Sequence, residues 1–513
     1  MAKYLINYKN QKSKISKDIY GNFSEHLGRC IYDGLWVGKD SPIPNINGVR
    51  KDVIEALKAI KLPVLRWPGG CFADQYHWKD AIGPQSERKG IQNKTWGDIN
   101  EDNSFGTHEF MDMCEEIGCD VYLAGNLGTG SIQEMVDWVD YITSDGNSDM
   151  AQLRRKNGRE KPWNLKYFGI GNEVWGCGGE MTSDYYANLY RHVYHFVSAK
   201  TFMDTSSTKF IASGPSSGDY EWTDDVTKNL SQQTKPMSVV KSGAITDGLS
   251  MHHYCFAMAP GAKGFFDLLT AEDFREDEWY DLLFKAAEME ELIVKNDVIM
   301  TKYDPDKNIG LMVDEWGSWF RSEPGTNPHF LFQQNTLRDA VLAAITLNIF
   351  NKHSDRVKLA TIAQMINVLQ SVILTEGEKM VLTPTYYVFH LFKEHMDATL
   401  LDTFMETEKI GTGKNLIDNL FESSSVDADG NITVTICNTS MTANQNVDAT
   451  LYGVVAESAE AEILVSGDPH DCNTFEEPCK VGLKQHAVNL TENGFYMEVP
   501  AASVIRVRIQ VKA

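Results

Sequence analysis

Two short stretches of this chain each end a run of apolar residues on a carboxylate followed closely by tryptophan. The first, KYFGIGNEVWGCGG (Lys166–Gly179), has the composition of a buried strand that closes on Asn172 and Glu173. The second, NIGLMVDEWGSW (Asn308–Trp319), repeats the pattern and closes on Glu315. Because the carboxyl ends of parallel strands meet on one face of a closed barrel, this pattern predicts that Glu173 and Glu315 face each other.

Short apolar segments alternate with amphipathic helical segments over most of the chain, which is typical of repeated βα units. An open doubly wound sheet also alternates in this way, but no GxGxxG motif follows the first strand. We therefore predict an α/β fold whose catalytic part, residues 18–388, is a (β/α)8 TIM barrel. The predicted barrel strands are Tyr20–Ser24, Val64–Trp67, Asp120–Ala124, Tyr167–Gly171, Phe210–Ser213, Leu249–His252, Ile309–Val313 and Val357–Ala363.

The pattern changes after about residue 390 to strands of period two separated by Asp-Gly and Asn-Gly turns, which indicates antiparallel pairing. We predict a C-terminal antiparallel β-sandwich of the jelly-roll kind, made of residues 389–513 and joined by the lysine-rich strand in residues 1–17. The predicted sandwich strands are Asn431–Asn438, Ala449–Tyr452, Ala461–Val465, Phe495–Val499 and Ser503–Val511.

Charge and cysteine usage narrow the possible partners and location. The formal net charge of −23 argues against nucleic acid or an anionic membrane as a partner, because both would repel the protein. The first residues, MAKYLINYKNQKSK, lack the apolar core of a secretory signal. The nine cysteines show no C-x-x-C spacing, so we expect free thiols in a reducing, cytoplasmic compartment.

The polar residues at the predicted strand ends are mainly carboxylates, amides and aromatics, without a clear metal-ligand cluster. Paired carboxylates next to tryptophan suit glycoside hydrolysis, in which one carboxyl protonates the leaving oxygen and the other attacks the anomeric carbon. The pair His252-His253 is better explained by packing or hydrogen bonding than by zinc, since no HExxH motif accompanies it. The candidates are Glu25, His26, Arg66, Cys71, Asn126, Asn172, Glu173, His252, His253, Tyr254, Asp314, Glu315, Trp316, Gln364 and Asn367.

Seven segments make the chain resemble the α-L-arabinofuranosidases of glycoside hydrolase family 51, which belong to a large clan of barrel hydrolases. They follow one another in the family's order over most of the predicted barrel. The resemblance implies a TIM barrel with a β-sandwich and catalytic glutamates at the ends of strands 4 and 7. The segments are Ile19–Arg29, Leu65–Trp78, Asn126–Gly130, Gly169–Gly176, Ser250–Tyr254, Val313–Trp319 and Leu359–Leu369.

The resemblance also implies a retaining double displacement. Glu173 matches the acid/base and Glu315 the nucleophile, with their carboxyl groups about 5 Å apart. Asn172 matches the residue that binds the sugar 2-hydroxyl, and Tyr254 matches the tyrosine that orients the nucleophile.

Further positions match residues that surround the sugar in the family: Glu25, Cys71 and Gln364 hold furanose hydroxyls, and Trp96 lies near the pocket wall. The implied substrates are arabinose-containing oligosaccharides derived from arabinan or arabinoxylan, cut by an exo-acting enzyme. No cofactor or metal is implied, because an acid, a nucleophile and oriented dipoles suffice. The family further suggests a homo-oligomer, often a hexamer.

Three alternatives stay open at this stage. The same barrel could act on pyranosides as a β-xylosidase or an endoglucanase. The chain could be a carbohydrate-binding protein with an inactive barrel, although such a protein need not retain both glutamates. A metal-dependent hydrolase using His252, His253 and Asp314 is the third possibility.

Overall fold

The computed structural model describes residues 1–198, 207–231, 244–259, 261–264 and 267–512. Eight strands form a closed barrel in the order β10-β11-β12-β13-β2-β5-β8-β9, which confirms the predicted TIM barrel. Their bounds are β2 Gly21–Phe23, β5 Val64–Trp67, β8 Asp120–Gly125, β9 Tyr167–Ile170, β10 Lys209–Ala212, β11 Gly248–Phe256, β12 Gly310–Trp319 and β13 Val357–Ile362.

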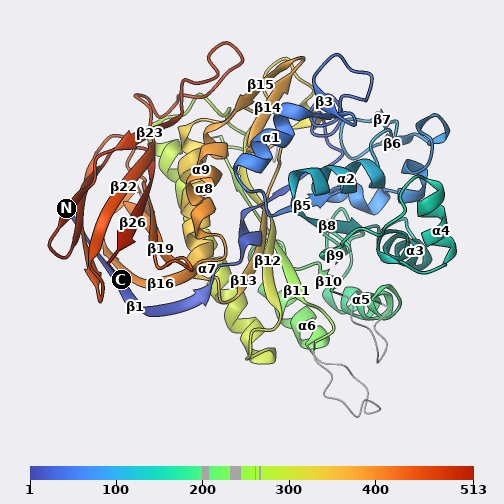
Figure 1. Ribbon diagram of the computed structural model, residues 1–513, viewed down its shortest axis with the longest axis horizontal. Coiled ribbons are helices and arrows are strands. Elements are labelled where there is room, and N and C mark those ends of the chain that lie inside the picture. The colour runs from blue at the N-terminus through green and yellow to red at the C-terminus, as the bar shows by residue number, and fades with distance from the viewer. Residues whose placement is uncertain (199–206, 232–243, 260, 265–266, 513) are drawn as a thin grey trace. The chain divides into compact units, whose positions relative to one another are not determined.

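Neighbouring barrel strands pair in parallel, so their carboxyl ends share one face. In β8 and β9, for example, Leu123 pairs with Phe168 and Gly125 with Ile170. All four residues of β5 and of β9 are buried, as expected of strands covered on both faces. Figure 1 shows β5, β8, β9 and β10 following one another in this order.

Helices alternate with these strands, and several begin at side-chain caps. Thr182 accepts a hydrogen bond from the backbone N–H of Tyr185 and caps α5. Gly106 is the cap of α2, whose first residue is Thr107. The helices are α1 Lys51–Ala59, α2 Thr107–Ile117, α3 Ile132–Thr143, α4 Asp149–Lys156, α5 Ser183–Val197, α6 Tyr220–Leu230, α7 Glu276–Tyr303, α8 Leu337–Lys352 and α9 Pro384–Phe392.

Chain contacts divide the protein into two compact units. One contains Gly21–His253 and Val294–Glu315, and the other contains Met1–Tyr20, Tyr254–Ile293 and Trp316–Ala513. The domain boundaries at residues 18 and 388 stay a prediction. Within the described ranges, none of the helices combines the length and apolarity required to cross a bilayer.

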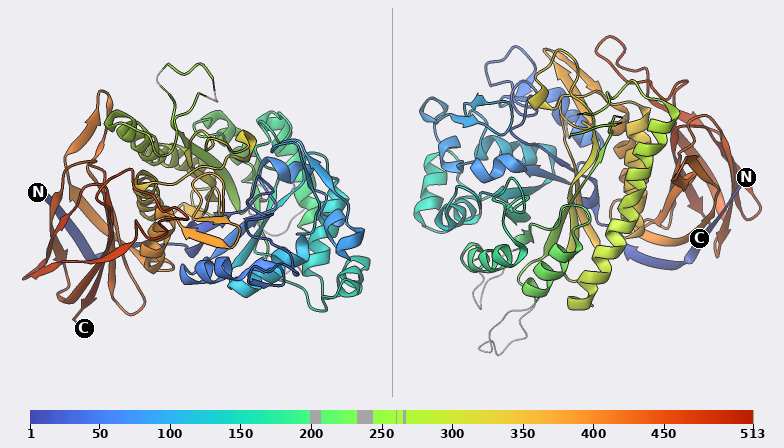
Figure 2. Two further views of the ribbon diagram at one scale, coloured as in Figure 1. Left: turned by 90° about the horizontal axis from the view of Figure 1, so that it is seen from above. Right: turned by 180° about the vertical axis from the view of Figure 1, so that it is seen from behind.

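The second of these units contains a ten-stranded sheet, which forms the predicted β-sandwich. Its order is β23-β22-β26-β20-β19-β16-β1-β21-β25-β24, with the N-terminal strand β1 between β16 and β21 (Figure 2). Its inward side chains include Val434, Phe495 and Ile505, all fully buried. The bounds are β1 Ala2–Lys14, β16 Thr399–Glu406, β19 Leu420–Val426, β20 Ile432–Asn438, β21 Gln445–Tyr452, β22 Ala456–Leu464, β23 Leu483–His486, β24 Asn489–Thr491, β25 Gly494–Val499 and β26 Ser503–Val511.

Four short hairpins complete the described strands. They are β3 Asn45–Ile46 with β4 Val49–Arg50, β6 Ile91–Asn93 with β7 Ile99–Glu101, β14 Ile373–Glu376 with β15 Lys379–Leu382, and β17 Lys409–Thr412 with β18 Asn415–Asp418. The turn between β6 and β7 carries Trp96, one of the predicted site residues.

Candidate active site

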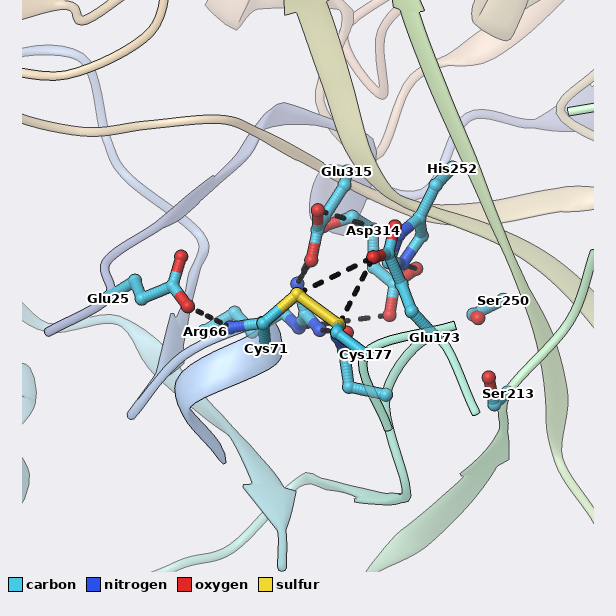
Figure 3. A network of polar contacts seen from close by, with 12 residues as sticks. Glu25, Arg66, Cys71, Glu173, Cys177, Ser213, Ser250, His252, Asp314 and Glu315 are labelled. Atoms are coloured by element: carbon cyan, nitrogen blue, oxygen red, sulfur yellow. Dashed lines mark hydrogen bonds and ion pairs between the residues drawn. A yellow bond between two sulfur atoms is a disulfide. The ribbon is translucent and has the colours of Figure 1, made fainter. Parts of the chain in front are cut away.

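Four barrel strands place polar side chains into one cluster near their carboxyl ends (Figure 3). Arg66 comes from β5, Glu173 follows β9, His252 lies in β11 and Glu315 lies in β12. Glu173 has a φ of 41°, in the left-handed region that non-glycine residues seldom adopt. Such strain is typical of functional positions.

The strand β12 continues to Trp319, beyond the predicted end at Val313. Glu315 is therefore an inward residue of a strand rather than part of a loop, and it is 5% exposed. A strand holds a side chain more rigidly than a loop does, so the position of the Glu315 carboxylate is well defined.

The two glutamates are close neighbours. One carboxylate oxygen of Glu173 and one of Glu315 lie within 4.8 Å of each other and of a ring nitrogen of His252. Glu173 is partly exposed, whereas Glu315 and His252 are buried. One carboxylate thus reaches solvent and the other does not.

Arg66 fixes the orientation of the buried glutamate. Its Nη1 donates to Oε1 of Glu315 at 2.8 Å, and its Nη2 donates to Oδ1 of Asn172 at 2.6 Å. The guanidinium is 1% exposed and stacks over the ring of Phe23 at 4.4 Å. This buried, charge-assisted hydrogen bond fixes the position of Oε1 of Glu315.

His252 contacts three carboxylates at once. Its Nδ1 lies 2.8 Å from Oε1 of Glu173 and 3.4 Å from Oε2 of Glu315. Its Nε2 lies 3.2 Å from Oδ1 of Asp314. Burial alone would lower the pKa of His252, but the three carboxylates around the ring raise it to about 10. The side chain is therefore an imidazolium that donates from both nitrogens.

Asp314 anchors the far side of this imidazolium. Its Oδ2 accepts a hydrogen bond from the Tyr122 hydroxyl at 2.7 Å. Burial alone would raise the pKa of Asp314, but Arg66 and His252 hold it below its ordinary value. Asp314 is thus a buried carboxylate that orients the two cations.

Gly70 allows the cluster to be this compact. A Cβ added at Gly70 would lie 2.7 Å from Oε1 of Glu315 and 3.5 Å from Nδ2 of Asn172. This Nδ2 is buried and has no hydrogen-bond partner among the described residues. Since an unmet buried donor is costly, it marks a place where a ligand oxygen can bind.

Glu25 and Trp96 meet at the edge of the cluster. Oε1 of Glu25 accepts hydrogen bonds from the backbone N–H groups of Gly70 and Phe72 and from Nε1 of Trp96, at 3.0, 3.1 and 2.9 Å. Trp96 is held in turn by its backbone N–H, which donates to Oδ1 of Asn93. The structure thus brings the two predicted residues into direct contact with each other.

Cys71 is joined to Cys177 by a disulfide, with the two Cα atoms 5.6 Å apart. The expectation that all cysteines are free thiols was therefore wrong. The fold brings together two loops whose cysteines are separated by 106 positions, a relationship that spacing along the chain does not reveal. The sulfurs lie 3.6 and 3.4 Å from Oε2 of Glu173, so the bond borders the predicted acid.

Asp74 connects the loop of Cys71 to the next loop of the barrel. Its Oδ1 accepts hydrogen bonds from the backbone N–H groups of Leu127 and Gly128, at 2.8 and 2.9 Å. Burial raises the pKa of Asp74 to about 7, although these backbone donors favour its ionised form. The Asp74 carboxyl therefore holds these two loops together beside the site.

Two predicted residues belong to the other compact unit. Tyr254 lies in β11, and its ring meets that of Trp319 edge-on at a centroid distance of 5.0 Å. Gln364 follows β13 and is 2% exposed. Their contacts with a sugar stay a prediction.

The residue types alone did not reveal the roles of Arg66, His252 and Cys177. Arg66 and His252 stood among the strand-end candidates, but only the fold shows that each contacts the carboxylates of other strands. The only feature of Cys177 visible in the sequence is its position four residues after Glu173. This position indicates a role near Glu173 only when Cys71 is known to lie beside Cys177 in the fold.

A parallel barrel with two adjacent carboxylates at its carboxyl-terminal face has the arrangement of a barrel glycoside hydrolase. Residues 56–242 match the α-L-arabinofuranosidase 1 domain, and residues 314–503 match the α-L-arabinofuranosidase C-terminal domain. The chain belongs to the α-L-arabinofuranosidases of glycoside hydrolase family 51.

Individual relatives cover nearly the whole chain. A Bacteroides ovatus protein named intracellular exo-α-L-arabinofuranosidase is 46% identical over 97% of this chain and 94% of its own length. The family 51 arabinofuranosidase structure from Xanthomonas axonopodis pv. citri is 40% identical, with a TM-score of 0.94 and 99% coverage of each chain. The arabinose complex of the Thermotoga maritima enzyme is 29% identical, with a TM-score of 0.85 and complete coverage of both chains.

Proposed function

We propose that this protein is a retaining, exo-acting α-L-arabinofuranosidase in which Glu173 is the acid/base and Glu315 the nucleophile. The observation that carries the proposal is the approach of the two carboxylates to within 4.8 Å. Retaining enzymes hold their carboxyl groups about 5 Å apart, whereas inverting enzymes leave about 6.5–9.5 Å for a water molecule. The short distance therefore supports double displacement.

In the first step Glu315 attacks the anomeric carbon while Glu173 protonates the leaving oxygen, which gives a covalent arabinosyl-enzyme. In the second step Glu173 takes a proton from water, and that water displaces Glu315 from the same carbon. Two inversions leave the α configuration unchanged. The partial exposure of Glu173 supports its role, because leaving group and water both reach the sugar from the solvent side.

Arg66 and His252 support the nucleophile. Both are buried cations in contact with Glu315, at 2.8 and 3.4 Å, so they fix the positions of its two oxygens. Neither residue needs to exchange a proton during the reaction.

Asn172 is the proposed ligand of the sugar 2-hydroxyl, because its unpaired Nδ2 supplies a donor beside Glu315. A hydrogen bond at this hydroxyl strengthens in the transition state. The remaining proposed contacts to the arabinofuranose are Glu25, Cys71, Trp96, Tyr254 and Gln364.

The proposed substrates are oligosaccharides from arabinan or arabinoxylan that carry terminal α-L-arabinofuranosyl groups. The names of the relatives support this sugar, and the name of the Bacteroides ovatus protein supports exo action and a cytoplasmic location. We also propose that the protein forms a homo-oligomer, with a hexamer as the expected size, which light scattering after gel filtration would measure.

The test is hydrolysis of aryl α-L-arabinofuranoside, β-D-xylopyranoside and β-D-glucopyranoside, with the Glu315→Ala variant as a blank. Far faster cleavage of the arabinofuranoside, lost in the variant, is the expected result. Preference for a pyranoside would replace the proposal by the β-xylosidase or endoglucanase alternative. Proton NMR of the first product formed tests retention, since an initial β-arabinose signal would contradict it.

A further inference from the structure

Three metal-ligating side chains meet at the rim of the site: Cys71, Cys177 and Glu173. One atom from each lies within 4.8 Å of the others. Figure 3 shows the disulfide directly beside the Glu173 carboxylate. The double displacement makes no use of Cys177.

The distances fit the coordination shell of zinc. With Zn–S bonds near 2.3 Å and Zn–O bonds near 2.1 Å, a tetrahedral ion holds sulfur and oxygen ligands about 3.6 Å apart. The two sulfurs already lie 3.6 and 3.4 Å from Oε2 of Glu173. Only the separation between the sulfurs must increase, which follows when the bond between them is reduced.

The cluster is accessible and its charge attracts a cation. Cys177 is exposed and Cys71 and Glu173 are partly exposed, so a reductant and a hydrated ion can both reach it. Thiolate ligands select soft or borderline ions such as Zn²⁺ over Mg²⁺ or Ca²⁺. Three protein ligands leave one position for water, as in open zinc sites.

A second group of possible ligands, Glu173 with His252 and Glu315, is less suitable. Each ring nitrogen of His252 already lies within hydrogen-bond distance of a carboxylate oxygen, 2.8 Å for Nδ1 and Glu173 and 3.2 Å for Nε2 and Asp314. A metal ion at either nitrogen would have to replace that contact. The cysteine group has no such obstacle.

We propose that the reduced protein binds Zn²⁺, or another thiophilic divalent ion, through Cys71 Sγ, Cys177 Sγ and Glu173 Oε2, and that the disulfide prevents this binding. Reduction by a dithiol or a phosphine adds two electrons and two protons and yields two thiols. Binding of Zn²⁺ then releases both thiol protons.

Metal binding is expected to inactivate the enzyme. This expectation rests on the proposed acid/base role of Glu173. A carboxylate oxygen that is bound to zinc can neither give nor accept the proton of the leaving group. Loss of activity is therefore expected only when the protein is both reduced and exposed to the metal.

The first test measures binding without using activity. The whole protein is reduced with a phosphine, because a thiol would itself bind the metal, then desalted without oxygen and titrated with Co²⁺. Reduced protein is expected to show thiolate-to-cobalt absorption in the near ultraviolet, which Zn²⁺ abolishes by displacement. Oxidised protein is expected to show none.

Variants locate the site. Cys177→Ser is expected to lose the cobalt absorption and Glu173→Gln to weaken binding, whereas Cys479→Ser, at an exposed free cysteine, is expected to match the parent protein. No cobalt absorption from the reduced parent protein would overturn the proposal, as would full absorption from Cys177→Ser.

The second test measures arabinofuranoside hydrolysis in increasing Zn²⁺. The half-inhibitory concentration is expected to fall by at least about 100-fold on reduction, a shift that Cys177→Ser does not show. Equal inhibition of both redox states would overturn the proposal and favour binding elsewhere. If the parent protein hydrolyses no arabinofuranoside, the proposed function fails, and the cobalt titration still decides the metal site.

Discussion

Nδ1 of His252 lies 2.8 Å from Oε1 of Glu173 and 3.4 Å from Oε2 of Glu315, so one buried cation contacts both proposed catalytic carboxylates. The acid and the nucleophile are consequently held by a shared group rather than by separate supports. Any change at the imidazole is expected to disturb both half-reactions.

His252→Gln tests this shared support. Glutamine keeps one hydrogen-bond donor but removes the positive charge, so kcat on an aryl arabinofuranoside is expected to fall by about 100-fold, the scale of a misplaced catalytic group. An unchanged kcat, or an effect confined to KM, would contradict the positioning role.

The His252→Gln variant also tests whether the charge of His252 makes the stability of the wild-type protein depend on pH. The folded-state pKa of His252, about 10, is above the ordinary value of 6.5, so its stabilisation is complete below pH 6.5 and is lost as pH rises through 10. Urea unfolding should therefore show the wild type losing its advantage over His252→Gln between pH 6.5 and 10. A constant difference would indicate that the ring is not charged.

Glu173→Ala tests the acid/base. With a good phenolic leaving group the first step needs little acid, so arabinosyl-enzyme should form quickly and then accumulate. Azide, which needs no general base, should restore turnover and give an α-arabinofuranosyl azide through two inversions. Burst kinetics and NMR of the product measure this, and a variant with full activity and no response to azide would remove Glu173 from the mechanism.

Gly70→Ala tests the close contact beside the nucleophile. The backbone of Gly70 has φ −88° and ψ −105°, a ψ outside the regions that alanine favours, and the added methyl group would lie 2.7 Å from Oε1 of Glu315. We expect kcat to fall by about 100-fold, because a displacement of about 1 Å has that effect, and the unfolding free energy to fall as well, because the backbone is strained. Gly176→Ala is the matched control, since its added Cβ meets nothing closer than 3.7 Å.

Asp74→Asn tests how Asp74 holds the loop of Cys71 to the loop of Leu127 and Gly128. Asparagine keeps the oxygen that accepts from Leu127 and Gly128 but cannot ionise. Because the folded-state pKa of Asp74, about 7, exceeds its unfolded value near 3.8, the folded state binds the extra proton and wild-type stability falls as pH rises between these values. Unfolding at pH 5 and pH 8 should show the wild type losing stability relative to Asp74→Asn. Asp74→Ala, which frees both N–H groups, should be less stable at either pH.

The eight barrel strands were predictable because each is a short apolar run with clear ends, and all eight occur in the closed barrel. The strand containing Glu315 was predicted too short, since polar residues that face a catalytic centre look like a strand end in the sequence. Several sandwich strands, β16 and β19 among them, were not predicted. Most residues of β16 are partly exposed, and β19 carries polar residues at buried positions, so both strands give a weaker period-two signal.

For the site, the sequence and its family resemblance pointed to Glu173, Glu315, Asn172, Glu25 and Trp96, which lie in or beside the cluster. The contacts of Arg66 and His252 could not be predicted, because each depends on side chains from other strands of the barrel. The pairing of Cys71 with Cys177 could not be predicted for the same reason.

The Cys71–Cys177 bond closes a chain loop of 106 residues. In the loop-entropy model, a cross-link over about 100 residues disfavours the unfolded chain by roughly 4.7 kcal/mol. A reducing environment would therefore lower the stability of the folded enzyme. It would also allow a metal ion to bind at Glu173. In the cell, the redox state of one bond would set both how readily the chain unfolds and whether metal can inactivate the enzyme.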